Sequence, residues 1–225
     1  MSLRLDPGKA RAVEYPDSDG QPMAENTLQF DWIVTIKENL AAIFRDDPNV
    51  FVAGDLLWYP IEGDNKTRAA PDAMVAFGRP AGHRGSYKQW EEGGVAPQVV
   101  FEVLSPGNRL AEMVRKFQFY GDHGVEEYYV LDPYKQELDG WERRAGKLEV
   151  IEPIDGWVSP RLGVRFSLEG GECRFIRPDG QPFFTFAELD AQRDAEKQRA
   201  NAEKQRADAA DRRVEALQAQ LRALG

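Results

Sequence analysis

Three acidic residues of this chain lie in or beside strongly apolar segments, where an ionised carboxylate needs a partner. Glu102 lies inside the run Val-Val-Phe-Glu-Val-Leu at 99–104, Asp72 opens the apolar run 73–77, and Asp55 lies within the run 51–59. Moving an ionised carboxylate out of water costs several kcal/mol unless something compensates the charge. The three residues therefore indicate a shared positive partner, either a bound divalent cation or a basic side chain.

Lys116 is the natural basic candidate, because it lies on a predicted helix that begins just after the Glu102 strand. A helix that folds back on this strand points Lys116 at the strand's end. The spacing also allows a surface pair with Glu112 at i−4, which contributes about 0.3–0.5 kcal/mol. The pattern leaves both interpretations open. It also leaves open purely structural roles for Glu102, in a buried ion pair, and for Asp72, in a turn.

Several other chemistries are excluded by the residues present. The chain has two histidines and one cysteine, too few for a Cys/His zinc site, and it contains neither a Gly-x-Ser-x-Gly nor a Gly-x-Gly-x-x-Gly motif. The formal net charge is −9, and residues 187–225 are neutral, with eight basic and eight acidic side chains. The acidity of the remaining chain argues against loose, non-specific DNA binding but is compatible with a metal-dependent site.

The elements that must position these residues follow from apolar periodicity and turn signals. We expect a helix from residue 27 capped by Asn26 or Thr27, then strands at 51–59 and 72–77, and a loop at 78–97 with at most one short helix. A strand at 98–104 and a helix from Asn108 to Tyr120 follow, with Leu110, Met113, Val114 and Phe117 as its apolar stripe. A strand at 127–131, a hairpin at 136–151 and a β-rich run at 164–175 complete the pattern.

This order predicts an α/β fold with a mixed β-sheet flanked by helices, in which the helix after residue 108 is a crossover between parallel strands. We predict an extended N-terminal arm at 1–24, the α/β domain at 25–182 with a β-rich C-terminal part, and a helical tail at 183–225. No apolar segment is long enough to span a membrane, no secretory signal is visible, and a lone Cys173 fits a reducing compartment, so a cytoplasmic location is expected.

The tail differs in kind from the rest of the chain. A block of seven residues, Ala-Glu-Lys-Gln-Arg-Ala-Asn/Asp, occurs twice from Ala195, and a 3,4 spacing continues to the end. From Ala207 this seam is filled by Ala, Ala, Val, Leu, Leu and Leu, which favours a coiled coil and a homo-oligomer, with a dimer preferred. The alternative is a single solvated helix held by Glu–Lys and Glu–Arg pairs.

Four segments, in the same order along the chain, resemble the Uma-type putative restriction endonuclease family, a bacterial branch of the PD-(D/E)XK nuclease superfamily. The resemblance covers residues 27–150 and depends on these segments: Pro71-Asp72-Ala-Met-Val-Ala, Val-Val-Phe-Glu102-Val-Leu-Ser-Pro106, Arg115-Lys116-Phe-Gln-Phe-Tyr120 and Gly124-Val-Glu-Glu-Tyr-Tyr-Val-Leu-Asp-Pro133. It implies a restriction-endonuclease-like fold.

The resemblance also implies roles for individual residues. Asp72, Glu102 and the backbone carbonyl of Val103 would bind Mg²⁺, or Mn²⁺ in its place. The superfamily pattern puts its lysine at position 104, which is Leu104 here, and Lys116 from the following helix takes that place. The implied reaction is metal-dependent hydrolysis of DNA phosphodiester bonds with Asp72, Glu102 and Lys116 as catalytic residues.

The sequence leaves a second function open: a catalytically inactive nuclease-fold scaffold or binding protein that assembles through its coiled coil. The net charge and the heptads favour this alternative. The roles of Asp55, Glu25 and Glu38, and the DNA sequence or structure recognised, are not specified by the residues.

Overall fold

The computed structural model describes residues 13–18, 20 and 22–224. The chain divides into two compact units, Met1–Phe183 and Phe184–Gly225. Much of the predicted N-terminal arm, residues 1–12, 19 and 21, lies outside the described residues. The described part between residues 13 and 24 contains neither helix nor strand.

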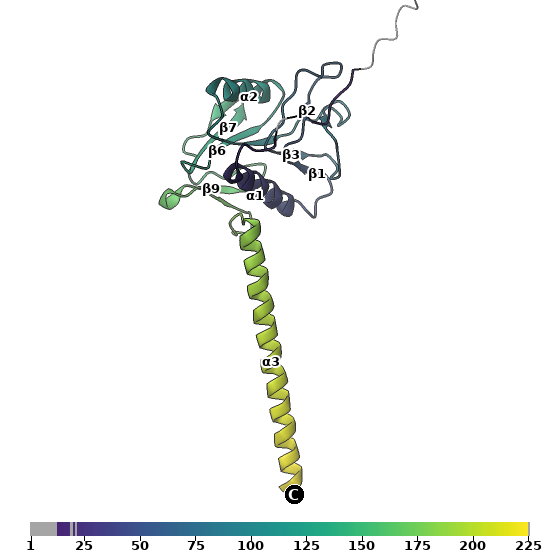
Figure 1. Ribbon diagram of the computed structural model, residues 1–225, viewed down its shortest axis with the longest axis vertical. Helices are drawn as coiled ribbons and strands as arrows, with labels where there is room; N and C mark the ends of the chain where they lie inside the picture. The colour runs from purple at the N-terminus through teal and green to yellow at the C-terminus, as the bar shows by residue number, and fades with distance from the viewer. Residues whose placement is uncertain (1–12, 19, 21, 225) are drawn as a thin grey trace, which may run out of the picture. The chain divides into compact units, whose positions relative to one another are not determined.

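A six-stranded mixed sheet forms the centre of the first unit (Figure 1). Strands β5 and β6 are parallel, whereas the other pairings in this sheet are antiparallel. The prediction of a mixed sheet is therefore confirmed. In spatial order the strands are β1 (Val50–Ala53), β3 (Ala73–Phe77), β5 (Val99–Val103), β6 (Glu127–Asp132), β7 (Glu137–Arg144) and β8 (Lys147–Val150).

Helices α1 (Thr27–Ile43) and α2 (Leu110–Asp122) lie on opposite sides of this sheet (Figure 1). The predicted start of α1 is confirmed, because the Asn26 side chain accepts a hydrogen bond from the backbone N–H of Gln29 at 3.0 Å. Helix α2 connects the parallel strands β5 and β6, as predicted, since parallel neighbours need a crossover.

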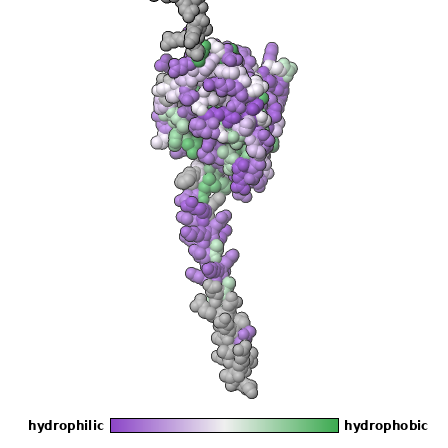
Figure 2. Space-filling model, turned by 90° about the vertical axis from the view of Figure 1, so that its right-hand side faces the viewer, coloured by the Kyte–Doolittle hydropathy of each residue, from purple (hydrophilic) through white to green (hydrophobic). Residues whose placement is uncertain are grey.

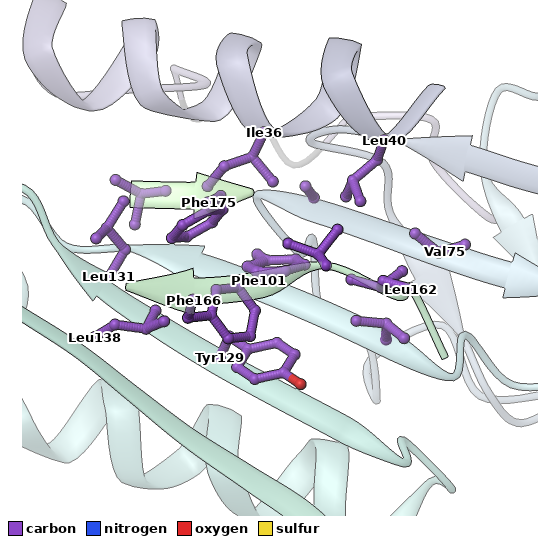
Figure 3. Close-up of a cluster of buried hydrophobic side chains, with 14 of the residues drawn as sticks. Ile36, Leu40, Val75, Phe101, Tyr129, Leu131, Leu138, Leu162, Phe166 and Phe175 are labelled. Carbon is purple, nitrogen blue, oxygen red and sulfur yellow. The ribbon is translucent and has the colours of Figure 1, made fainter. Parts of the chain in front are cut away.

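One apolar core fills the space between the sheet and α1 (Figure 3). Ile36 and Leu40 from α1 meet Phe101 and Tyr129 from the sheet. Phe166 on β9 (Arg165–Ser167) and Phe175 on β10 (Arg174–Ile176) pack against the same cluster, with the short 3-10 helix Glu169–Gly171 between these strands. Each fully buried side chain of this size stabilises the fold by about 1.5–3 kcal/mol.

A second core lies on the α2 side of the sheet. Its members from the sheet include Val100, Tyr128 and Val130, which alternate along their strands with residues of the first core. Tyr120 of α2 and Trp58 complete its centre. The same alternation puts Glu102 on the face with Val100, toward α2.

The prediction of one continuous strand at 51–59 is wrong. Strand β1 ends at Ala53, and β2 (Trp58–Tyr59) pairs with β4 (Tyr87–Lys88) in a separate parallel two-stranded sheet. The break has a backbone cause, because Asp55 adopts a positive φ of 48°, which no strand residue uses. The predicted loop at 78–97 contains β4 and turns, and no helix is assigned there.

Two details predicted for α2 are also wrong. Its N-cap is Arg109, and the Asn108 side chain instead accepts a hydrogen bond from the backbone N–H of Ser105 at 2.7 Å. Leu110 and Val114 of the predicted apolar stripe are 81% and 46% exposed. Met113 and Phe117 of the predicted stripe do pack against the second core, so the stripe is half right. The inward face of α2 also carries Lys116 and Tyr120, which both bind Glu102.

Helix α3 (Phe186–Leu224) makes up nearly all of the second unit. Its start is a reciprocal cap, in which the Thr185 backbone N–H donates to Glu188 at 2.8 Å and the Glu188 backbone N–H donates to the Thr185 hydroxyl at 3.3 Å. Side chains at 200, 203 and 207 are exposed, whereas those at 210, 214, 217, 221 and 224 lie outside the described residues. The coiled coil therefore stays a prediction.

The face of the first unit that Figure 2 shows is mainly hydrophilic. Purple side chains dominate the face of the first unit in Figure 2, and they also dominate the described side chains of α3. Among the residues that the structure describes, none of the helices combines the length and apolar character needed to cross a membrane.

Candidate functional site

Asp72 and Glu102 face each other across two neighbouring strands. The antiparallel register of β3 and β5 pairs Ala73 with Phe101, and continuing it by one residue brings Asp72 opposite Glu102. The backbone N–H of Val103 donates to Oδ2 of Asp72 at 2.7 Å, which fixes this carboxylate at the end of the strand pair. Both side chains point to the α2 side of the sheet.

Glu102 is only 2% exposed and has a partner at each carboxylate oxygen. The Lys116 ammonium lies 2.6 Å from Oε2, and the Tyr120 hydroxyl donates to Oε1 at 2.5 Å. Lys116 thus reaches the strand and forms its ion pair with Glu102 instead of Glu112. Both partners lie on α2 one turn apart, so a single helix face holds the carboxylate from two directions.

The charges of this cluster shift the pKa values of its members. Burial raises the pKa of Asp72 well above its usual value, and the neighbouring Glu102 charge raises it further. Burial alone would lower the pKa of Lys116, but the charges of Glu102 and Asp72 outweigh burial and raise it. Lys116 is therefore a cation at neutral pH. One ammonium faces two carboxyl groups, so it balances the charge of only one of them when both are ionised.

The donor atoms suit a magnesium ion. Among the described residues, no three His, Cys, Asp or Glu side chains gather into a metal cage. Mg²⁺, however, commonly uses one or two carboxylates and keeps several waters. The Val103 carbonyl accepts a hydrogen bond from the Gln29 side chain at 2.8 Å. Its second lone pair remains for another contact. Asp72, Glu102 and this carbonyl are a donor set that fits the ion.

A pocket of about 730 Å³ opens beside the cluster, and Asp72 and Lys116 line it. Glu25 and Asp55 line the same pocket, and the Ser105 hydroxyl donates to Glu25 at 2.5 Å. Glu38 is not among the lining residues and pairs with Lys37 at 2.7 Å on the surface. Of the three acidic residues without an assigned role, the structure thus brings two to the pocket.

Two residues next to the cluster were missed by the sequence analysis, Tyr120 and Gln29. Tyr120 lies four residues after Lys116, and this spacing on a helix places both on one face. Gln29 is a buried polar residue on the core-facing line of α1 that continues with Ile33 and Ile36. In both cases the signal was a polar group at an apolar position.

A second buried carboxylate, Glu127 at the start of β6, was also missed. It is 2% exposed and accepts hydrogen bonds from the Tyr129 hydroxyl at 2.9 Å, the Arg161 backbone N–H at 2.8 Å and the Ser159 hydroxyl. These donors are all neutral, and none of them belongs to the Asp72, Glu102 and Lys116 cluster. The pattern fits a structural role.

A family model matches a large part of this chain. Residues 2–171 match the model of the family Uma2, described as "Putative restriction endonuclease". The solved structures that match include a putative nuclease belonging to DUF820 from Anabaena variabilis ATCC 29413, with 15% identity and a TM-score of 0.45 over 60% of this chain and 72% of that chain. No curated protein matches. Because the family model spans most of the chain, this protein belongs to the Uma2 family.

Proposed function

We propose that the protein is a metal-dependent endonuclease that hydrolyses DNA phosphodiester bonds. The observation that carries the proposal is the convergence of Asp72, Glu102 and Lys116 beside the pocket. Family membership supports a nuclease-like function. Asp72, Glu102 and the Val103 carbonyl would hold Mg²⁺ or Mn²⁺, which supplies a Lewis acid and lowers the pKa of water.

Lys116 acts in this proposal as a fixed cation. The charges of Glu102 and Asp72 raise the pKa of Lys116 and thereby favour its protonated form. An ammonium at the pocket wall instead orients a phosphate oxygen and stabilises the negative charge that develops there during hydrolysis. Tyr120 holds the second oxygen of Glu102 and thereby fixes the direction in which this carboxylate faces.

Lys116→Ala tests the proposal in the full chain. We expect wild-type protein to cleave plasmid DNA with Mg²⁺ or Mn²⁺, and the variant to be slower by about 10²–10³-fold, the usual loss when one charge-stabilising donor is removed. Lys147→Ala, at an exposed position on β8, is the matched control and keeps the wild-type rate. Equal rates for the two variants would exclude the role assigned to Lys116.

We also propose that the tail joins two copies of the chain, because its seam ends in Val214, Leu217, Leu221 and Leu224. Leu217→Asp with Leu221→Asp should convert a dimer into a monomer, measured as a halved mass by light scattering after gel filtration. A wild-type monomer at all concentrations contradicts this proposal. A dimer that neither binds Mg²⁺ nor cleaves DNA would favour the alternative, an inactive scaffold.

A further inference from the structure

The pocket has a basic wall that the metal-binding roles do not use. Lys66, Arg68 and Arg115 line it together with Lys116, in a protein with a formal net charge of −9. The Lys116 ammonium already forms an ion pair with Glu102. Among the residues that the structure describes, the other three form no ion pair with a carboxylate. The same pocket is also lined by Glu25, Asp55, Asp72 and Glu112. The pocket as a whole is therefore not basic, and its attraction for an anion depends on the side where Lys66 and Arg68 lie.

The segment that carries Lys66 and Arg68 is a shaped loop. Asp64 accepts hydrogen bonds from the backbone N–H groups of Lys66 at 2.8 Å and Thr67 at 3.1 Å, and from the Thr67 hydroxyl at 2.7 Å. The Thr67 hydroxyl and these N–H groups lower the pKa of Asp64, so this turn persists at neutral pH. Ala69 then bridges to Trp58. These bonds fix the backbone of the loop from which the Lys66 and Arg68 side chains extend.

Residues 14 and 15, which precede α1, form hydrogen bonds with this loop. The Tyr15 hydroxyl accepts a hydrogen bond from the Gly63 backbone N–H at 2.5 Å, and the Asn65 side chain donates to the Glu14 carbonyl at 2.8 Å. The Tyr15 ring packs edge-on against Tyr59 with centroids 5.2 Å apart. A loop fixed at both ends and from outside loses little entropy when it binds a ligand.

Arg68 is the best-placed donor of this wall. Its Nη1 atom lies 3.3 Å from the hydroxyl of Tyr59, and its guanidinium lies 6.0 Å from the Tyr59 ring centroid. This contact uses one of five N–H donors and leaves the others of the planar fork available. A guanidinium fork matches two oxygens of a phosphate, which gives both charge and direction.

We propose that Lys66 and Arg68 form a phosphate-binding subsite that holds a DNA backbone phosphate beside the one to be hydrolysed. The inference deepens the proposed function and rests on it for the identity of the ligand. The subsite explains how an acidic protein can retain a polyanion: the loop supplies local positive charge in the pocket that Asp72 and Lys116 line.

The experiment measures binding apart from cleavage. Fluorescence anisotropy of a labelled DNA duplex in EDTA, over a range of NaCl concentrations, gives Kd and its salt dependence for the full chain. We expect Arg68→Ala to raise Kd about fivefold to tenfold and to reduce the slope of log Kd against log salt by about 1. Lys66→Glu, at an exposed position that does not affect folding, should weaken binding at least as much.

Arg45→Ala is the matched control, because Arg45 is exposed, pairs with Asp46 and does not line the pocket, yet its loss changes the net charge equally. An unchanged Kd for this variant supports the subsite. Equal weakening by Arg45→Ala and Arg68→Ala overturns it, since overall charge would then explain the effect.

A cleavage assay distinguishes failure of the phosphate subsite from failure of the proposed nuclease function. Wild-type cleavage with Mg²⁺ together with an unchanged Kd in both loop variants overturns the subsite and leaves the function standing. Binding that depends on Arg68, without cleavage in Mg²⁺ or Mn²⁺, supports the subsite and overturns the function.

Discussion

Glu102 and Glu127 lie on the neighbouring parallel strands β5 and β6, and both are 2% exposed, yet their surroundings differ completely. Glu102 faces α2, pairs with an ammonium and a tyrosine, and has a second carboxylate opposite it. Glu127 faces the other core and accepts hydrogen bonds from neutral donors.

The comparison shows that burial of a carboxylate in an apolar strand does not by itself indicate a functional site. A set of neutral donors satisfies a carboxylate and fixes two chain segments to each other. A cluster with two acids, one cation and an adjoining pocket concentrates charge where a ligand can reach it. The kind of partner and the access to solvent separate the two cases.

The largest expected effect comes from exchanging each glutamate for glutamine. Glu102→Gln removes one of the two carboxylates proposed to bind the metal, and we expect DNA cleavage to fall by about 10³-fold. Glu127→Gln should leave the rate per folded molecule within about twofold, because its carboxylate is bound by Tyr129, Ser159 and Arg161 and has no contact with the Asp72 cluster. Cleavage rates with Mg²⁺, normalised to the folded fraction from circular dichroism, measure both. Similar losses of cleavage rate in the two variants would contradict the catalytic role proposed for Glu102 and the structural role assigned to Glu127.

A smaller effect is expected on the free energy of unfolding, and it concerns Glu127 instead of Glu102. Glu127→Gln turns an acceptor into a donor that faces other donors, which costs about 1–2 kcal/mol of unfolding free energy at pH 7. Urea denaturation measures it. Glu126→Gln is the control, because Glu126 forms a half-exposed ion pair with Arg161 and its loss costs less than about 1 kcal/mol.

The pH dependence of this stability difference has a definite sign. Burial raises the pKa of Glu127 above 4.5, although its hydrogen bonds oppose the shift. A raised folded-state pKa means that the wild type loses stability relative to Glu127→Gln as pH rises from 4.5 through that pKa. The difference between the two proteins should therefore be larger at pH 4 than at pH 7. An opposite trend would show that Glu127 is stabilised as a carboxylate.

The smallest expected effect distinguishes two tyrosines of the α2 core. Tyr120 donates to Glu102, whereas the buried Tyr128 hydroxyl has no hydrogen-bond partner among the described residues. Tyr120→Phe should weaken Mn²⁺ binding about tenfold by calorimetry, since it frees the carboxylate to turn. Tyr128→Phe makes the same chemical change without losing a bond, so its Mn²⁺ affinity and stability should equal the wild type. Equal affinities for both variants would exclude a positioning role for Tyr120.

Much of the fold was predictable because its signals are local. Alternation along 98–104 correctly placed Glu102 on one face with Val100, and the Asn26 cap and the α2 crossover follow from short-range rules. The partner of Lys116 was not predictable, since Glu112 and Glu102 differ only in where the helix docks. The break at Asp55 was hidden because an apolar run does not reveal a positive φ.

The core face of α2 was only partly predicted, for a related reason. Hydrophobicity correctly favoured Met113 and Phe117, but it also favoured the exposed Leu110 and Val114 and gave no sign that Lys116 and Tyr120 bind Glu102. Glu127 was missed because its donors come partly from residues 159 and 161, more than thirty positions away along the chain. Long-range polar contacts of this kind leave no periodic signal in the sequence.

The ion pair between Lys116 and Glu102 has a consequence for how the protein tolerates a lack of metal. The chain supplies its own counter-ion for Glu102 from a helix, so the burial of this carboxylate does not require a bound ion. In the proposed nuclease, a chelator should therefore stop cleavage without unfolding the protein, and added metal should restore cleavage. Availability of the ion would then act as a reversible control on an already assembled molecule.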